Sequence, residues 1–137
     1  MHEQRELTIA TRGPGLTEFT AEARRFVADC GIECGLLTAF VRHTSASLII
    51  QENADPDVRL DLAEFFARLV PDGMEWLRHT LEGPDDMAAH IKAALTASSL
   101  SVPIAGGALA LGTWQGLYLF EHRSSPHRRR VLLHVSG

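Results

Sequence analysis

The chain has 137 residues, of which 45% are hydrophobic and 22% charged, proportions typical of a folded domain and not of a disordered or fibrous chain. Thirteen Lys and Arg residues against 17 Asp and Glu residues give a net charge of −4, whereas nucleic-acid binders carry a basic surplus. No apolar run approaches the roughly 20 residues of a membrane helix, and the first residues lack a signal-peptide core. We therefore expect one cytoplasmic domain over residues 1–137 that binds neither nucleic acid nor a membrane.

The first half of the chain predicts three strands and a helix. The strands are expected at residues 6–10, 36–41 and 47–50. The helix is expected from Thr20, its N-cap, to Cys30, with Gly31 as the C-terminal stop. Cys30 and Cys34 have no second cysteine pair nearby, so we expect two partly buried free thiols instead of a zinc site.

A second helix follows a clear start signal. Asp55 is placed to cap it and Pro56 suits its first position, where a missing N–H costs nothing. The apolar positions recur at helical spacing and predict a core-facing stripe: Val58, Leu62, Phe65, Phe66 and Leu69. The turn residues 71–73 end the run.

The last third of the chain predicts one more helix and four strands. The helix is expected from Met87 to Ala97, capped by Asp85 or Asp86, with Met87, Ile91 and Leu95 facing the core. The strands are expected at residues 100–104, 108–111, 116–121 and 130–135, with a hairpin signal at Gly106–Gly107. Seven short strands and three helices indicate a single α+β domain with an antiparallel, sandwich-like sheet.

Three of the seven histidines are candidates for chemistry. His43 follows a predicted buried strand, His79 lies in a polar connection, and His90 sits in the middle of the third helix. None forms a local pair with metal-ligand spacing, so a metal site would have to be assembled from distant segments. The alternative is that all three are structural histidines with satisfied hydrogen bonds.

Three further segments admit two interpretations each. The carboxylates and amide of residues 52–57 either cap the second helix or belong to a site. Trp114, between two glycines, is either a core plug or a platform for a flat ring. The arginine-rich segment 122–130 is either a solvated hairpin loop or a phosphate clamp.

Four motifs, in this order, resemble those of the YjbQ-like family: residues 43–46, 52–58, 89–93 and 111–116. The resemblance covers almost the whole chain and implies a compact α+β sandwich that assembles as a homotrimer. It also implies a secondary thiamine-phosphate synthase activity, with His43, His79 and His90 around a metal or anion site. One departure is Asp86, which stands where many members have an amide.

The implied reaction joins a pyrimidine pyrophosphate to a thiazole phosphate and releases pyrophosphate, so the expected ligands are a small phosphorylated metabolite and a divalent ion (zinc, manganese or magnesium). The expected catalytic residues are Glu121, Asn53 and Asp55, and the expected substrate-binding residues are Ser45, Trp114, Gln115, Arg129 and Lys92. Two alternatives remain open. One is a non-catalytic trimeric protein that binds a metal or a phosphometabolite. The other is a metal-dependent hydrolase with Glu121 or Glu52 as base.

Overall fold

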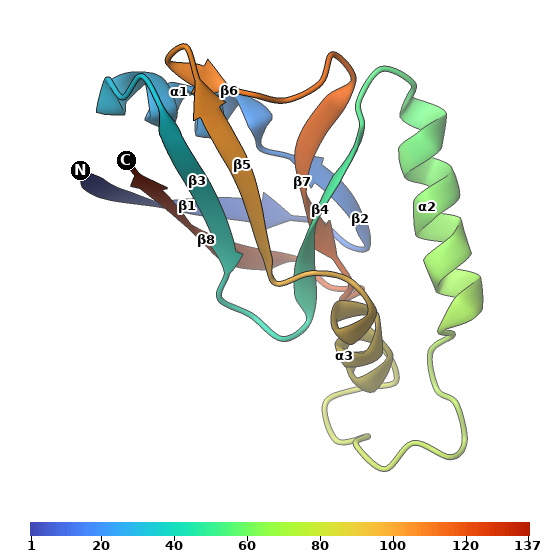
Figure 1. Ribbon diagram of the computed structural model, residues 1–137. Helices are drawn as coiled ribbons and strands as arrows, with labels where there is room; N and C mark the ends of the chain where they lie inside the picture. The colour runs from blue at the N-terminus through green and yellow to red at the C-terminus, as the bar shows by residue number, and fades with distance from the viewer.

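The computed structural model describes all residues from 1 to 137 and contains two antiparallel sheets with three helices (Figure 1). The larger sheet has the order β1-β8-β3-β5-β6 and the smaller one the order β2-β7-β4. The strands are β1 (His2–Thr11), β2 (Gly15–Glu18), β3 (Gly35–Val41), β4 (Ala46–Glu52), β5 (Ser99–Ala105), β6 (Ala108–Leu109), β7 (Gln115–Glu121) and β8 (His127–Ser136). The helices are α1 (Thr20–Cys30), α2 (Pro56–Leu69) and α3 (Asp86–Leu95). The predicted α+β class is confirmed.

The hydrophobic core joins both sheets to α1. In β8, Val131, Leu133 and Val135 are fully buried at every second position, as expected for a strand with one face on the core. They belong to one cluster with Phe26 of α1 and Leu119 of β7. None of the three helices combines the length and hydropathy that a membrane crossing requires.

Two strands differ from the sequence-based prediction. β1 begins at His2 instead of residue 6, and β2 was missed altogether although it pairs with β7 along its whole length. Both lie at sheet edges. The first half of β1 is exposed on both faces, so no alternation of apolar and polar residues marked it.

The end of α1 was predicted correctly, but its start was not. Gly31 adopts the left-handed conformation (φ 65°) that ends a helix. Phe19, not Thr20, is the N-cap, and no side chain caps the helix. The Thr20 hydroxyl instead accepts a hydrogen bond from the backbone N–H of Leu117 and donates one to Glu18. At the other end of the helix, Cys30 is buried but Cys34 is exposed, and both thiols are free.

Helix α2 starts as predicted but does not pack as predicted. The Asp55 carboxylate accepts a hydrogen bond from the backbone N–H of Asp57, and Pro56 opens the helix. No residue of α2 is buried, and Phe65 and Leu69 of the expected core stripe are 57% and 53% exposed. The reason is that α2 stands at the outside of the small sheet with no further element over it (Figure 1).

Helix α3 buries a different face from the one predicted. Leu95 is 57% exposed and Met87 and Ile91 are only partly covered, whereas the buried side chains of the helix are Asp86, Ala88, Ala89 and Lys92. The two alanines are small enough for the helix to approach its neighbours closely. Asp85 occupies the N-cap position without capping the helix, because its carboxylate is bonded to residues 123 and 124. This rotation of α3 turns two charged side chains inward.

Candidate functional site

Two histidines and a carboxylate form a compact cluster at the start of α3. The ligand atoms of His79, Asp86 and His90 all lie within 4.8 Å of one another. Oδ2 of Asp86 is 2.6 Å from Nε2 of His79 and 3.1 Å from Nε2 of His90. The Asp86 side chain is buried, whereas both imidazoles remain partly exposed. The cluster therefore has a buried carboxylate on its inner side and two solvent-accessible imidazoles on its outer side.

The cluster is built partly by helical spacing. Asp86 and His90 are four residues apart on α3, which places them on the same face one turn apart. His79 comes from the connection between α2 and α3, which folds back onto the first turn of α3. Two histidines at this spacing are the usual metal-ligand signal in a helix, and here a carboxylate takes the place of one of them, so the pattern was not recognisable as a histidine pair.

The tautomer of His90 follows from its second contact. Nδ1 of His90 lies 2.8 Å from the backbone carbonyl oxygen of Thr44, and a carbonyl can only accept a hydrogen bond, so Nδ1 carries a proton. In the neutral ring, Nε2 then presents a lone pair to the Asp86 carboxylate. Either a metal ion or a second proton on the ring makes this contact favourable. A carbonyl that fixes the tautomer behind a histidine is typical of metal-binding histidines.

Asp86 is held in its charged form. Burial by itself would raise the pKa of Asp86, but the hydrogen bond with His79 and the charge of Arg123 help to outweigh it and hold the pKa below its ordinary value. Arg123 Nη1 lies 2.8 Å from Oδ1 of Asp86, on the side away from the histidines. The same guanidinium bonds Asp85 and thereby ties the start of α3 to the loop after β7.

These residues fit a divalent metal ion. Two imidazoles and one carboxylate suit zinc, manganese or iron better than magnesium, which prefers oxygen ligands only. The buried carboxylate supplies negative charge, and the orientation of His90 supplies a lone pair. The partly exposed rim leaves room for further ligands from a substrate or water.

His43 lies near this cluster but does not belong to it. Its Nε2 accepts a hydrogen bond of 2.8 Å from the backbone N–H of Arg130, so that nitrogen is already engaged. Burial, followed by the charges of Arg129 and Arg130, lowers the pKa of His43. His43 and His90 both line a shallow hollow of about 290 Å³. The structure thus brings His79, Asp86 and His90 together, and a role of His43 in the site stays a prediction.

Glu121 and Arg129 form a buried ion pair instead of a free acid and a free base. Glu121 is 1% exposed and Arg129 is 4% exposed. Oε1 of Glu121 accepts hydrogen bonds from Thr11 and from Nε of Arg129, while Oε2 accepts from Nη2 of Arg129 and from two backbone N–H groups. Burial alone would raise the pKa of Glu121, but these bonds lower it. A carboxylate engaged in this way has little capacity to take a proton from a substrate.

The ion pair instead positions the loop that orients His90. Nη2 of Arg129 donates to the hydroxyl of Ser45 and contacts the Ser45 carbonyl. Ser45 follows Thr44, whose carbonyl accepts from His90. We therefore interpret Ser45, Glu121 and Arg129 as a support for the cluster, while their direct contact with a substrate stays a prediction.

Lys92 lies on α3, whereas the other remaining candidates lie at the other end of the β4–β7 ladder. Ala46 pairs with Glu121 at one end and Glu52 with Gln115 at the other, which separates the ends by about 20 Å at the usual rise per residue. The four candidates at or just beyond the second end are Asn53, Asp55, Trp114 and Gln115. Within one chain they do not join the cluster, and their catalytic or binding roles stay predictions.

Each of these four side chains has a local structural role or is exposed. Asp55 caps α2, and Gln115 accepts a hydrogen bond from the backbone N–H of Gly112. Asn53 donates to Glu18, and Trp114 is 62% exposed. The capping interpretation of the acidic loop therefore accounts for Asp55, and Trp114 is not a core plug.

Comparison with known proteins agrees with the motifs. The chain is 58% identical to a UPF0047 protein of Synechocystis over 134 residues, which cover 98% of this chain and 91% of the relative. It is 41% identical to the UPF0047 protein YjbQ of Escherichia coli O157:H7, covering 100% of this chain and 99% of the relative. Among solved structures, a hypothetical protein of Aeropyrum pernix K1 matches with a TM-score of 0.89 and 30% identity, over 98% of each chain. Residues 5–137 match the family described as UPF0047 protein YjbQ-like, and the chain belongs to that family.

Proposed function

We propose that His79, Asp86 and His90 bind a divalent metal ion and that the protein uses it to bind and activate a small phosphorylated metabolite. The observation that carries this proposal is the orientation of His90: its Nε2 lone pair faces the buried, ionised Asp86 because Nδ1 donates to the Thr44 carbonyl. A metal ion between Nε2 and the carboxylate would make this contact favourable with a neutral ring, where otherwise a second ring proton is needed. A bound metal ion would stabilise negative charge on a phosphoryl oxygen as a Lewis acid.

The surrounding residues have separate tasks in this proposal. Arg123 holds the second oxygen of Asp86 and keeps the carboxylate turned toward the histidines. The metabolite binds in the hollow beside His90. The imidazole of His43 lines this hollow, and its lowered pKa favours the neutral form. Glu82, whose carboxylate lies 3.6 Å from Nε2 of His79, is an exposed acid near the cluster that the sequence analysis did not single out.

The reaction that we propose is the one implied by the family resemblance: a pyrimidine pyrophosphate is joined to a thiazole phosphate with release of pyrophosphate. The support from the site is its ability to hold a cation that can offset the charge of a leaving pyrophosphate. The ligand set favours zinc or manganese over magnesium, and this distinguishes the site from the all-oxygen sites that usually bind pyrophosphate.

The cytoplasmic location also remains a prediction.

The metal part of the proposal is tested by elemental analysis and titration calorimetry. Wild-type protein should bind about one equivalent of zinc or manganese, and Asp86→Asn or His90→Ala should weaken binding by at least about tenfold. His2→Ala is the matched control, because this exposed histidine lies on β1. Unchanged binding in Asp86→Asn and His90→Ala would contradict the proposal.

The reaction is tested with metal-loaded and metal-free protein. Release of pyrophosphate only when both substrates are present supports the synthase reaction. Release of phosphate or pyrophosphate from a single substrate would instead indicate a hydrolase. Metal and metabolite binding with no turnover would indicate the non-catalytic alternative.

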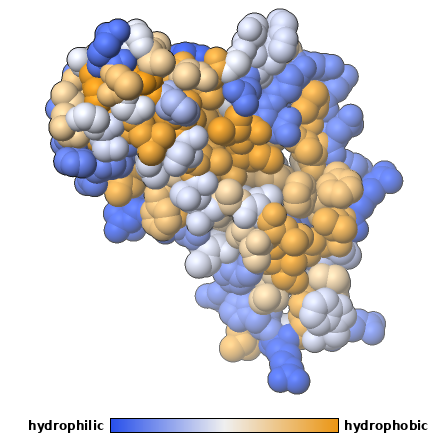
Figure 2. Space-filling view, viewed as in Figure 1, coloured by the Kyte–Doolittle hydropathy of each residue, from blue (hydrophilic) through white to orange (hydrophobic).

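We also propose that the chain assembles as a homotrimer, as the family resemblance implies. Hydrophobic side chains are exposed over α3 and beside α2 (Figure 2). The large apolar residues of this region that are more than half exposed are Leu60, Phe65, Leu69, Trp76, Leu81 and Leu95. Apolar surface of this kind and uncovered sheet edges favour association. Analytical ultracentrifugation should give three times the 15.0 kDa chain mass, and a stable monomer at micromolar concentration would contradict the proposal.

A further inference from the structure

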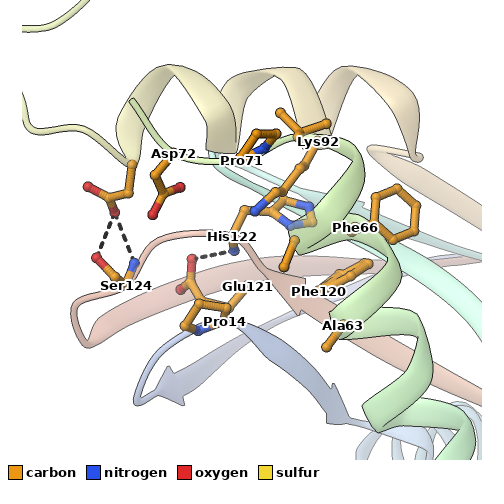
Figure 3. A pocket seen from close by; sticks show the side chains of 13 residues that line it. Pro14, Ala63, Phe66, Pro71, Asp72, Lys92, Phe120, Glu121, His122 and Ser124 are labelled. Carbon is orange, nitrogen blue, oxygen red and sulfur yellow. Dashed lines mark hydrogen bonds between the residues drawn. The ribbon is translucent and has the colours of Figure 1, made fainter. Parts of the chain in front are cut away.

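A separate cavity of about 220 Å³ lies between α2, α3 and the end of β7 (Figure 3). Its apolar walls include Phe66 and Ala63 of α2 and Phe120 of β7, with the two phenyl rings in edge-to-face contact at 5.3 Å. Its polar lining includes Lys92 of α3 and His122, which directly follows β7. The cavity therefore has largely apolar walls and two polar nitrogen groups, the ammonium of Lys92 and the imidazole of His122.

The ammonium group of Lys92 has no partner within the protein. The residue is only 7% exposed, yet its ammonium group has no hydrogen bond within the protein and no carboxylate within 4.0 Å. Two acids in the lining are already paired, Asp85 with Arg123 and Glu121 with Arg129. The Lys92 nitrogen keeps some contact with solvent, because it is not among the fully buried atoms without a partner. An anion in the cavity could therefore pair with this ammonium without displacing a protein group.

The Nδ1 atom of His122 is a hydrogen-bond acceptor that no donor reaches. The hydrogen bonds that link the Lys92 carbonyl, Thr96, Ser47 and His122 determine which ring nitrogen carries the proton. The Thr96 hydroxyl lies 2.8 Å from the Lys92 carbonyl and 2.6 Å from the Ser47 hydroxyl. The carbonyl can only accept, so the single Thr96 proton goes to it, and Ser47 donates to Thr96. Ser47 Oγ, 2.8 Å from Nε2 of His122, must then accept from that nitrogen.

The other ring nitrogen of His122 is consequently left with a lone pair. Burial, followed by the charge of Lys92, lowers the pKa of His122 to about 4, so the ring is neutral at pH 7. Its Nδ1 is buried and is the only such side-chain atom in the protein that lacks a hydrogen-bond partner. A buried acceptor without a donor costs free energy that a ligand with an N–H or O–H group can recover.

We propose that this cavity is a binding site for a small monocarboxylate that carries a hydroxyl or N–H group on a compact apolar body. The carboxylate pairs with Lys92, the O–H or N–H donates to Nδ1 of His122, and the apolar body lies against Phe66 and Phe120. A single ammonium matches a single negative charge, whereas a phosphate dianion would leave most of its acceptors unpaired here. The exposed Asp72 at the cavity further disfavours a dianion.

This site is distinct from the metal cluster. His90 lies in the hollow lined by Ala93 and Ala94, whereas Lys92 lines the cavity together with α2 residues. The two lining sets share no residue. Binding in the cavity is therefore expected in metal-free protein, and it does not depend on the function proposed above.

The chain offers an unusually direct probe, because Lys92 is its only lysine. Protein labelled with ¹³C at lysine Cε gives a single lysine signal, which is titrated with 2-, 3- and 4-hydroxybenzoate after treatment with a chelator. At least one isomer should shift this signal saturably. Benzoate, which lacks the donor, and phenol, which lacks the carboxylate, should each bind about tenfold more weakly than that isomer.

Two variants separate the contributions of the polar groups, with binding followed by calorimetry. Lys92→Met should weaken binding of the best isomer by about tenfold or more. His122→Phe should remove the preference for hydroxybenzoate over benzoate. Arg25→Met, which removes an exposed cation on α1, is the control and should change nothing.

The wild-type titrations keep the proposal falsifiable even if a variant folds poorly. Absence of a saturable shift with all three isomers would overturn it, and so would equal affinity for benzoate and the best hydroxybenzoate. Binding that disappears on metal removal would also overturn it, because the probes would then be reporting on the cluster near His90.

Discussion

Candidate polar residues lie at both ends of the β4–β7 ladder, but they are buried at one end and exposed or used in local turns and caps at the other. At the Ala46–Glu121 end, an ion pair, a histidine and the start of α3 are buried together. At the Glu52–Gln115 end, polar side chains cap a helix or close a turn at the surface. An acid, an arginine and a serine made the first end a candidate in the sequence, and an acid, two amides and a tryptophan made the second. The comparison teaches that the burial of polar groups, more than their presence, distinguishes the candidate site.

The burial of a polar or charged group costs free energy. A charged group taken out of water needs compensation from partners, so a fold retains such groups only where they are well bonded. Glu121 and Arg129 meet this condition fully, whereas Nδ1 of His122 is buried without a partner. The end near α3 therefore combines a buried ion pair with one buried polar atom that lacks a hydrogen bond, and the opposite end has neither.

The largest expected effect is at the buried ion pair. Arg129→Met leaves the Glu121 carboxylate buried without its partner and should lower the free energy of unfolding by about 3–5 kcal/mol. Urea unfolding followed by circular dichroism measures this loss. The double variant Glu121→Leu/Arg129→Met should recover part of it, because no charge is then left unpaired. A loss below about 1 kcal/mol in the single variant would refute the contrast between the two ends.

A pH effect of intermediate size is expected from His122. Its pKa is lowered to about 4 in the folded protein, against about 6.5 in the unfolded chain, so between these values only the unfolded chain binds the proton. The contribution of His122 to the free energy of unfolding should therefore fall by about 2 kcal/mol from pH 7 to pH 5 and vanish well above pH 6.5, and the lowered pKa of His43 acts in the same direction.

His122→Phe supplies the comparison for this pH effect. Because the lowered pKa values of Glu121, Asp85 and Asp86 affect stability only below their ordinary range near 4, they contribute little between pH 5 and 7. The difference in unfolding free energy between wild type and variant should shift by about 2 kcal/mol across this interval. If the unfolding free energies of wild type and His122→Phe changed equally with pH, the pKa of His122 would not be lowered in the folded protein.

The smallest effects are expected at the opposite end of the ladder. Asp55→Ala removes the cap of α2 and should cost about 1 kcal/mol. Trp114→Ala alters a side chain that is 62% exposed and should change stability by less than about 0.5 kcal/mol. Chemical unfolding measures both, and metal binding by both variants should equal that of wild type. Reduced metal affinity in either variant would show that the two ends act together, for instance between subunits.

The sequence by itself determined the features that depend on neighbours along the chain. The α+β class, the start of α2 at Asp55 and Pro56, and the stop of α1 at Gly31 all follow from local periodicity, capping and backbone freedom. His79 and His90 were also candidates from their positions in a polar connection and in the middle of a helix, and the resemblance of the motifs implied that they share a site.

Only the tertiary structure decided which faces are buried and which distant groups meet. Alanines 88 and 89 allow α3 to pack closely through a face that the apolar stripe did not indicate, and this turns Asp86 and Lys92 inward. His79 meets Asp86 through the fold of a connection, and His122 meets Ser47 across 75 residues. Periodicity reports the amphipathic character of one element at a time. The partner of a buried polar group depends instead on how elements far apart in the chain pack together.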